Sequence, residues 1–378
     1  MFGIKTIDMK IGILTQPLRT NYGGLLQAYA LQTILKQLGH EVTIINRCYP
    51  KAQRNILSKL LNIKNIVLGR DAICYDKRQI SFVEENTSRF ISKNYKLSPP
   101  IYTTEELKAY QQMEKLGAII VGSDQVWRPR YSPKIYNYFL DFAEGMNVKR
   151  YSYAASFGVD NWEYNQHETE VCSKLAKLFN KISVREASAV SLCKEHLGVE
   201  AQHVLDPTLL LSQQDYISLL AGNTQPSKGN LFTYILDAGE EKQSVINKIS
   251  EVAGLKPFIC MPKLKFTYKN AKNGLKDCQF PAVEQWIQSF IDAEMVITDS
   301  FHGTAFSIIF NKPFWVLANP RRGNTRMESL LATFNLKERM ISSENINSKD
   351  LNASIDWESV NAIKESLRKK SIDFLTSI

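Results

Sequence analysis

Short apolar runs alternate with segments of helical periodicity along this chain. Residues 10–14 form an apolar run too short for a helix, and they predict a buried strand. Leucine and isoleucine then recur at helical spacing from residue 25 to residue 38, until Gly39 ends the pattern. A β-branched run at residues 42–46 follows. Strand, glycine-containing loop, helix and strand in this order predict the opening unit of a parallel α/β sheet.

The same alternation continues to residue 205 and restarts after a linker. The further strands expected before the linker are residues 118–121, 150–155, 181–184 and 204–205, and those after it are 232–236, 257–260, 295–298 and 314–317. The linker is expected at 222–229, which contains glycine, asparagine, proline and serine. We therefore predict an α/β fold of two Rossmann-like domains that face each other across a cleft, with ligands at the carboxyl ends of the strands.

This pattern divides the chain into three parts. Residues 1–221 are expected to form an N-terminal α/β domain, and residues 222–350 a C-terminal one. Residues 351–378 contain an amphipathic helix that is expected to cross back to the N-terminal domain. Helical periodicity and basic residues at 51–115 predict a helical insertion in the first domain. Its first part, 51–78, is either a solvated cover or a basic surface for membrane headgroups or a lipid-linked acceptor.

Composition narrows the classes of protein. A length of 378 residues favours two domains, and a net charge of +9 favours an anionic partner. Neither an RNP-like pattern nor a zinc finger is present, so no nucleic-acid partner is expected. The six cysteines have no paired spacing, which predicts reduced thiols and no metal site. With no signal-like start and no apolar run of about 20 residues, a cytoplasmic protein is expected, with peripheral membrane association left open.

The turn at residues 299–303, Asp-Ser-Phe-His-Gly, combines several chemical features. It follows a predicted strand and precedes a helix expected from Thr304, where free N–H groups and the helix dipole favour an anion. Gly303 permits close approach of a ligand, and His302 can exchange a proton near neutral pH. Asp299 or Ser300 could orient the imidazole. The alternative is that Ser300 only caps the helix and His302 is a satisfied, partly buried histidine. We favour the catalytic interpretation, since the chain has few histidines and this one occupies a strand-to-helix turn.

Polar residues follow other predicted strands. Residues 21–24 lack the G-x-G-x-x-G spacing of a dinucleotide site, so they form either a tight turn or a ligand loop. Asp124 either caps a helix or takes part in catalysis or acceptor binding. Arg185 either pairs with Glu186 or binds a ligand. Residues 206–208 are interpreted as a structural exit from the first domain.

With these motifs assembled, the sequence resembles the polysaccharide pyruvyl transferase family over nearly its whole length. The motifs that carry the resemblance are residues 21–24 (NYGG) with 26–32 (LQAYALQ), 122–127 (GSDQVW), 153–158 (YAASFG), 183–186 (SVRE), 204–208 (VLDPT), 299–303 (DSFHG) and 324–327 (NTRM). No single motif is decisive, but their order along the chain makes the resemblance specific.

The resemblance implies a GT-B-like fold and transfer of pyruvate from phosphoenolpyruvate to two hydroxyls of a sugar, giving a cyclic ketal. It implies that His302 and Arg185 engage the donor. Many relatives carry an arginine immediately or shortly before the histidine, whereas this chain has Phe301 next to it and no arginine from 292 to 302. The cations that could replace it are Arg185, Arg321, Arg322 and Arg326.

The expected site has a catalytic, a donor and an acceptor part. His302 is expected to act as the acid and Asp124 as the base. The remaining expected donor-binding residues are Arg185, Ser300, Gly303, Thr304 and Arg326, and the acceptor-binding residues are Asn21, Tyr22, Gly23, Gly24 and Ser123. Neither a cofactor nor a metal is expected beyond the donor substrate.

The sequence thus predicts a ketal pyruvyl transferase in surface polysaccharide biosynthesis, such as assembly of capsule, exopolysaccharide or cell-wall glycan. Its partners would be phosphoenolpyruvate and a sugar acceptor that is free or lipid-linked, with peripheral contact to the inner membrane surface in the second case. Two alternatives stay open: a glycosyltransferase of the same architecture that uses a nucleotide sugar, and a non-catalytic glycan-binding protein.

Overall fold

The apolar runs assemble into two all-parallel sheets in the computed structural model, which describes residues 9–50, 62, 64, 65, 72, 74, 76–220, 222, 224–319 and 324–378. The first sheet has the order β2-β1-β3-β4-β5-β6 and the second β11-β10-β9-β7-β8. The strands of the first are β1 Lys10–Leu14, β2 Glu41–Ile44, β3 Ala118–Val121, β4 Lys149–Ala155, β5 Lys181–Val184 and β6 Gln202–His203. Those of the second are β7 Leu231–Tyr234, β8 Pro257–Phe258, β9 Met295–Thr298, β10 Phe314–Leu317 and β11 Met340–Ile341. The predicted fold class is confirmed.

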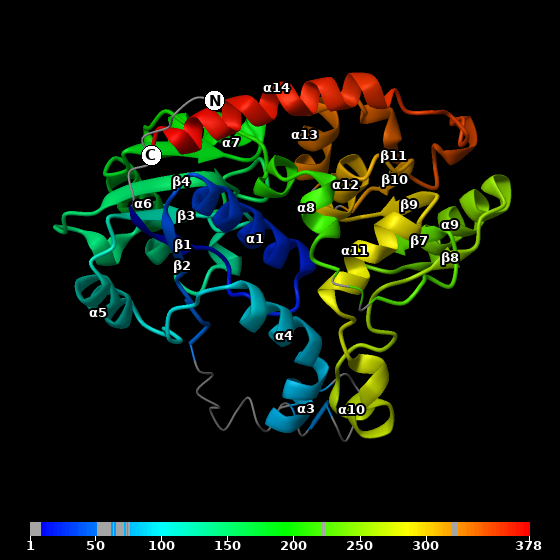
Figure 1. The fold of residues 1–378 in the computed structure, drawn as a ribbon, viewed down its shortest axis with the longest axis horizontal. Helices are drawn as coiled ribbons and strands as arrows, with labels where there is room; N and C mark the ends of the chain where they lie inside the picture. Colours follow the sequence, from blue (N-terminus) through cyan, green and yellow to red (C-terminus); the bar gives the residue numbers. More distant parts are fainter. Residues whose placement is uncertain are drawn as a thin grey trace.

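Helices follow or connect these strands (Figure 1). The α-helices are α1 Tyr22–Gln37, α3 Lys77–Val83, α4 Glu85–Asn94, α5 Thr104–Glu114, α6 Gln166–Ala176, α7 Ala187–Leu192, α8 Gln213–Ile217, α9 Glu240–Ala253, α10 Tyr268–Asn273, α11 Val283–Asp292, α12 Phe301–Ile309, α13 Thr325–Thr333 and α14 Trp357–Thr376. The 3-10 turns are η1 Pro129–Tyr131, η2 Ile135–Phe139, η3 Asp141–Ala143, η5 Pro207–Leu210, η6 Leu275–Cys278, η7 Lys337–Arg339 and η8 Ile346–Ser348, and η4 Cys193–Leu197 is a π-turn. Among the helices described here, none combines the length and apolar character needed to cross a bilayer.

Several expected boundaries were wrong, including the start of one helix and the position of one short strand. The helix after β9 begins at Phe301 rather than Thr304, because the Ser300 side chain caps it by accepting a hydrogen bond from the Gly303 N–H. The last short strand of the first sheet is residues 202–203 rather than 204–205, because Gln202 and His203 are the residues that pair with Ser183 and Val184 of β5. The part of the basic insertion at 51–61, 63, 66–71, 73 and 75 lies outside the described residues.

Strand register brings polar loops to one edge of each sheet. Leu14 of β1 pairs with Val121 of β3, so both strands end at the same level. In the second sheet Tyr234 of β7 pairs with Thr298 of β9. Because all strands are parallel, the loops at 15–24 and 122–125 share one edge, and those at 235–238 and 299–302 share the other.

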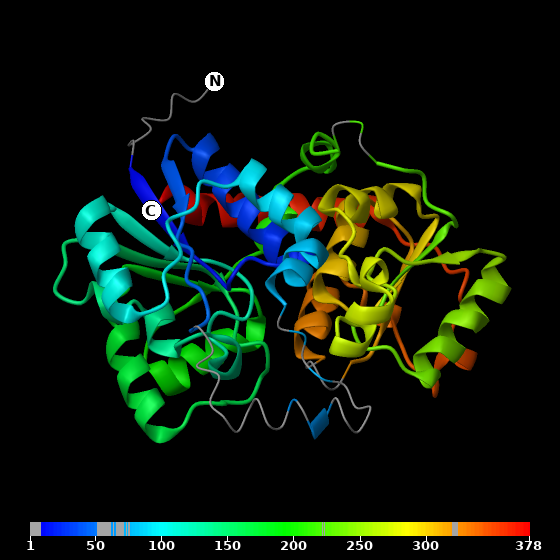
Figure 2. The same cartoon turned by 90° about the horizontal axis from the view of Figure 1, so that it is seen from below.

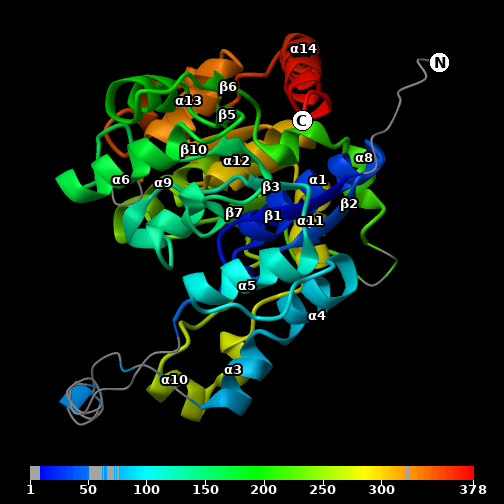
Figure 3. The same ribbon diagram turned by 90° about the vertical axis from the view of Figure 1, so that its left-hand side faces the viewer.

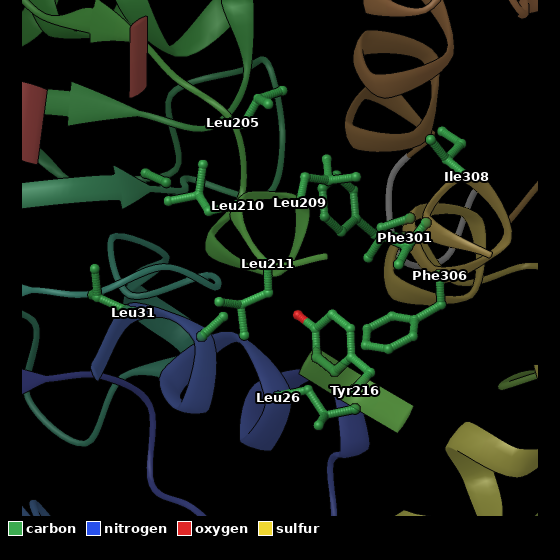
Figure 4. Packing of buried hydrophobic residues seen from close by; sticks show 14 of the residues in the cluster. Leu26, Leu31, Leu205, Leu209, Leu210, Leu211, Tyr216, Phe301, Phe306 and Ile308 are labelled. Atoms are coloured by element: carbon green, nitrogen blue, oxygen red, sulfur yellow. The ribbon is translucent and has the colours of Figure 1, made fainter. Parts of the chain in front are cut away.

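The two halves are joined by an apolar core and by helices that cross between them. Figure 4 shows Leu26 of α1, Leu209 of η5, Tyr216 of α8 and Phe306 of α12 directed into one cluster, in which the rings of Tyr216 and Phe306 lie 4.8 Å apart. Helix α14 runs along one side of both halves (Figures 1 and 2).

Helix α14 ends against the first sheet. The Arg368 Nε donates to the Leu210 carbonyl at 2.7 Å, and the Leu205 N–H donates to the Ser371 hydroxyl at 3.1 Å. The ring of Phe374 packs against that of Tyr153 at 6.1 Å between centroids. The chain end is therefore part of the core of the first half.

A second bridge lies on the opposite side of the molecule, where α3 packs next to α10 and η6 (Figures 1 and 3). The Phe280 N–H donates to the Val83 carbonyl at 3.0 Å, and the Asn86 amide donates to the Phe280 carbonyl at 2.8 Å. The described helices of the insertion thus bind the second half as well as the first.

Candidate active site

The facing loops of the two halves enclose a cavity of about 270 Å³. Its lining is Thr20, Asn21, Tyr22, Asp124 and Gln125 from the first half and Tyr234, Leu236, Met261, Phe280, Asp299, Ser300, Phe301, His302, Arg326 and Met327 from the second. The cavity therefore lies at the carboxyl ends of strands from both sheets, where parallel α/β proteins bind ligands. Tyr22 joins the two walls, since its hydroxyl donates to the Pro281 carbonyl at 2.8 Å.

His302 lies in the first turn of α12 and is held from both sides of its ring. A Cβ placed on Gly23 would come within 2.0 Å of the imidazole Nδ1, so the ring packs directly on the glycine backbone. On the other side, Nε2 lies 3.7 Å from Oδ2 of Asp206. That separation is too long for a hydrogen bond, and Nε2 is buried without one. The contact with Asp206 is therefore electrostatic.

Asp206 is the buried carboxylate that faces this histidine. Its Oδ2 accepts from the Ser123 hydroxyl at 2.8 Å and from Nη1 of Arg185 at 3.1 Å. Its Oδ1 accepts from the N–H and hydroxyl of Thr208 at 2.9 and 2.7 Å. Burial alone would raise the pKa of Asp206, but His302, Arg185 and the Thr208 N–H together hold that pKa well below its usual range. Asp206 is thus an ionised partner for an imidazolium.

Arg185 is buried beneath the cavity rather than among the residues that line it. Its Nε donates to Glu186 at 3.0 Å, and its guanidinium lies 4.2 Å from the centre of the Phe301 ring. Although burial opposes its charge, Glu186 and Asp206 raise the pKa of Arg185 above its ordinary value. The Phe301 ring is therefore a platform for this arginine from the other half.

Arg326 is the one arginine or lysine among the described residues that line the cavity. It is partly exposed and lies at the start of α13. Burial, followed by the charge of Arg185, lowers the pKa of Arg326 to about 10, while Glu186 and Asp124 oppose the shift. The guanidinium stays charged at neutral pH. The other two expected cations, Arg321 and Arg322, lie outside the described residues.

Asp124 and Asn21 meet on the wall formed by the first half. The Asn21 amide donates to Oδ2 of Asp124 at 3.3 Å, and Oδ1 of Asp124 accepts from the Gln125 N–H at 2.9 Å. Asp124 has φ +75°, in the left-handed region that non-glycine residues rarely adopt. The turn after β3 thereby holds a carboxylate at the cavity in a sparsely populated backbone conformation.

Asp299 does not orient His302, as the sequence had suggested it could. Its carboxylate accepts from Nζ of Lys242 at 2.6 Å and from the Asn319 amide at 2.9 Å. It also accepts from the Leu236 N–H at 2.6 Å. Asp299 therefore fixes the loop after β7 to the loop after β9, and Ser300 is engaged in capping α12.

The remaining expected site residues divide between the wall and the layer behind it. Gly303 has no room for a side chain, because an added Cβ would lie 2.1 Å from Oγ1 of Thr298. Ser123 and Thr304 are fully buried, and neither lines the cavity. The Ser123 hydroxyl is used by Asp206, and the Thr304 hydroxyl donates to the Ser300 carbonyl at 3.1 Å.

The position of Asp206 at the site was not predicted from the sequence. This residue was interpreted as part of a structural exit, although it stands in one of the motifs that carry the family resemblance. Met261 and Phe280, which line the cavity from the second half, were also missed because they carry no chemical signal. Within the described residues, no group of three or more histidines, cysteines or acidic residues is placed to hold a metal ion.

Fold and cavity define a class of protein: a two-domain GT-B-like α/β protein whose interdomain cavity carries a histidine, carboxylates and an arginine. Comparison with family models identifies the family. The model described as polysaccharide pyruvyl transferase matches residues 21–321, most of the chain, and the protein belongs to this family. Membership implies a transferase with a pyruvyl donor and a polysaccharide sugar acceptor. The comparison with curated proteins gave no significant match.

Matches to solved structures extend over nearly the whole chain, and the one with a TM-score of 0.50 supports the fold. TcCGT1 in complex with UDP matches over 98% of this chain and 99% of its own, with 9% sequence identity and a TM-score of 0.50. UGT71G1 of Medicago truncatula, complexed with UDP-glucose, matches over 97% and 98%, with 12% identity and a TM-score of 0.47. The UDP-GlcNAc 2-epimerase of Methanocaldococcus jannaschii matches over 95% and 93%, with 12% identity and a TM-score of 0.47. At these identities the likeness concerns the fold alone.

Proposed function

We propose that this protein transfers pyruvate from phosphoenolpyruvate to two hydroxyls of one sugar of a glycan, forming a cyclic ketal and releasing phosphate. The observation that carries the proposal is the position of His302 at the cavity, fixed between Gly23 and the ionised Asp206. An imidazole with a buried carboxylate partner is suited to deliver a proton near neutral pH. The pathway we propose is surface polysaccharide biosynthesis.

The donor would lie against the second half. Phosphoenolpyruvate carries about three negative charges near neutral pH, and it needs charged and hydrogen-bonding donors. Arg326 on the cavity wall supplies the guanidinium, and the first N–H groups of α12 supply donors that have no partner within the helix. Ser300, Gly303 and Thr304 shape this helix start. Arg185 acts behind the wall, where it holds Asp206 and the Phe301 ring.

The proposed reaction begins when His302 protonates the methylene carbon of the donor. The resulting oxocarbenium-like C2 is attacked by the first sugar hydroxyl, the C–O bond to phosphate breaks, and the second hydroxyl closes the ring. The two hydroxyls release two protons: one replaces the proton given to carbon and the other leaves with phosphate. Asp206 stabilises the imidazolium, and Asp124 accepts a hydroxyl proton.

The acceptor would lie against the first half, next to Asp124. Asn21 and Tyr22 contribute side chains to this wall, and Gly23 allows the chain to pass close to His302. Gly24 leaves room for the Asn21 side chain, whose amide nitrogen would lie 3.0 Å from an added Cβ. We accordingly propose residues 1–221 as the acceptor domain with its insertion at 51–115, residues 222–350 as the donor domain, and residues 351–378 as the segment that joins them.

The test is a phosphate-release assay with phosphoenolpyruvate across a panel of free and lipid-linked sugars, with mass spectrometry of the product. We expect release that depends on one acceptor, and a product that gains one pyruvate ketal. His302→Gln is expected to abolish release while retaining thermal stabilisation by phosphoenolpyruvate. Stabilisation by a nucleotide sugar and none by phosphoenolpyruvate would overturn the proposal in favour of glycosyl transfer.

A further inference from the structure

Residues 261–280 form an excursion from the second half that carries an unusual surface. The segment contains five lysines and one aspartate, a net charge of +4. All five lysines are exposed, namely Lys263, Lys265, Lys269, Lys272 and Lys276. Apolar side chains lie exposed among them: Leu264 is 38% exposed and Tyr268 is 45% exposed. Phe82 of the adjoining α3 is 37% exposed, and Lys77 and Arg78 extend the basic surface. We call these ten residues the basic apolar tip.

The tip is built on a folded base. Ala271 and Cys278 are buried between α10, η6 and α3, and the Leu264 N–H donates to the Asp277 carbonyl at 3.0 Å. The Gln279 amide donates to the Phe82 carbonyl at 3.0 Å. The apolar side chains are thus exposed because the local fold holds them outward. Figures 1 and 3 show α3 and α10 projecting together from the rest of the protein.

Acidic residues next to the tip are already engaged. Asp277 pairs with Lys263 at 3.3 Å, and Asp76 caps α3 by accepting from the N–H groups of Arg78 and Gln79. Glu85 accepts from the Gln279 amide at 3.1 Å, and Glu84 pairs with Arg19. Asp76 and Glu85 keep their charges, but the seven basic residues of the tip outnumber the four described acidic residues beside it, so this surface is positive.

The tip projects from a segment that borders the active-site cavity. Both ends of the excursion, Met261 and Phe280, line the cavity. The chain that carries the tip is thus continuous at both ends with the cavity wall.

We propose that the basic apolar tip docks on a bilayer of anionic lipid, and that the acceptor is presented there as a lipid-linked sugar. Lysines near a bilayer surface are attracted by anionic headgroups, and each further lysine adds to the attraction. Aromatic and leucine side chains enter the headgroup region between them. A soluble polyanion would use the charges but would leave Leu264, Tyr268 and Phe82 without a partner. The statement about the acceptor rests on the proposed function, whereas the docking itself does not.

The experiment is co-sedimentation of the full chain with phosphatidylglycerol–phosphatidylcholine vesicles and with pure phosphatidylcholine vesicles. We expect binding to the anionic vesicles alone. The triple variant Lys265→Glu, Lys269→Glu, Lys272→Glu should weaken binding by about a hundredfold or more. The matched control reverses the same number of exposed lysines on the first half, with Lys108→Glu, Lys174→Glu and Lys177→Glu, and should bind as the wild type does.

A second variant separates a bilayer from a soluble polyanion. Leu264→Ser with Tyr268→Ser keeps every charge, and it should weaken binding to anionic vesicles several-fold but leave retention by dextran sulfate unchanged. Equal vesicle binding by the lysine variant and its control would overturn the inference, and so would an equal loss of dextran sulfate binding in the serine variant.

The outcome is separable from that of the proposed function. Lysine and serine variants should release phosphate from phosphoenolpyruvate with a soluble acceptor at the wild-type rate. If the wild type turns over substrate but does not bind vesicles, the docking role of the tip is rejected and the proposed reaction stands. Vesicle binding without phosphate release on any acceptor would reject the reaction and keep the docking surface.

Discussion

The imidazole of His302 packs on the backbone of Gly23, although the two residues belong to different halves of the chain. An added Cβ at residue 23 would lie 2.0 Å from Nδ1 and 2.3 Å from Cγ of the ring. Gly23→Ala is therefore expected to displace the imidazole and lower kcat by at least about a hundredfold, since misplacing a catalytic group by about 1 Å has an effect of this size. Stability should fall by about 1–3 kcal/mol because the site becomes overpacked.

Gly239→Ala is the matched control, because a Cβ at that glycine has no neighbour within 4 Å. Its turnover should be close to that of the wild type. Unchanged turnover in Gly23→Ala would show that the ring tolerates displacement and that its position is not set by this contact.

Arg326 and Arg185 are expected to respond differently to the same substitution. Arg326→Gln removes the charge on the cavity wall, so KM for phosphoenolpyruvate should rise tenfold or more while the melting temperature stays near that of the wild type. Arg185→Gln leaves Asp206 and Glu186 buried without their cation, which should cost about 3–5 kcal/mol of stability.

Arg89→Gln, an exposed arginine on α4, serves as the control for both measurements. If Arg185→Gln raises KM and Arg326→Gln does not, the cation that binds the donor would be Arg185 rather than Arg326.

Asp124→Asn separates the charge of this residue from its backbone conformation. Asparagine adopts a positive φ at least as readily as aspartate, so the turn at φ +75° should form and the melting temperature should change little. Turnover should fall by about a hundredfold or more if Asp124 is the proposed base, a range typical of general-base catalysis. Asp124→Ala should additionally lose about 1 kcal/mol of stability from backbone strain. Wild-type turnover in Asp124→Asn would assign Asp124 to the architecture of the turn.

Asp206 makes part of the protein's folding stability depend on pH in the acid range. Its pKa in the folded protein lies well below the ordinary value of about 3.9. The unfolded chain therefore takes up this proton at higher pH than the folded chain does, so the stabilisation is complete above about pH 4 and is lost as pH falls further. Melting temperatures measured from about pH 6 to about pH 3 should decline less steeply in Asp206→Asn than in the wild type. The exposed Asp160, changed to asparagine, should leave the slope unaltered, and equal slopes in all three proteins would contradict this account.

Much of the fold was predictable because strands of a parallel sheet are buried on both faces and appear as continuous apolar runs. The runs at 118–121 and 295–298 coincide with β3 and β9. The pairing of β10 with the two-residue β11 was not predicted, since a strand so short has no pattern of its own. Ser300 is a good N-cap and indicates a helix that starts at Phe301. Gly303 favours a turn, and for this reason the predicted start of α12 was Thr304.

The candidate site was predicted one element at a time, and its pairings were not. The motifs that contain His302 and Asp124 were visible because each follows a strand. The contact of His302 with Asp206 depends on how the two halves dock, which spacing along one chain does not encode. The same holds for the contact of Arg185 with Phe301, which comes from the other half. The pairing of Arg185 with Asp206 lies within the first half, where the two residues follow neighbouring strands.

Since Asp206 and His302 come from different halves, the imidazole has its carboxylate partner only while the halves are docked. We expect this arrangement to restrict the proposed proton transfer to the state in which the halves are docked. An oxocarbenium formed in an open cavity would be captured by water, which would waste the donor as free pyruvate. Coupling of the proton donor to closure would confine protonation to the state in which sugar hydroxyls, rather than bulk solvent, surround the reactive carbon.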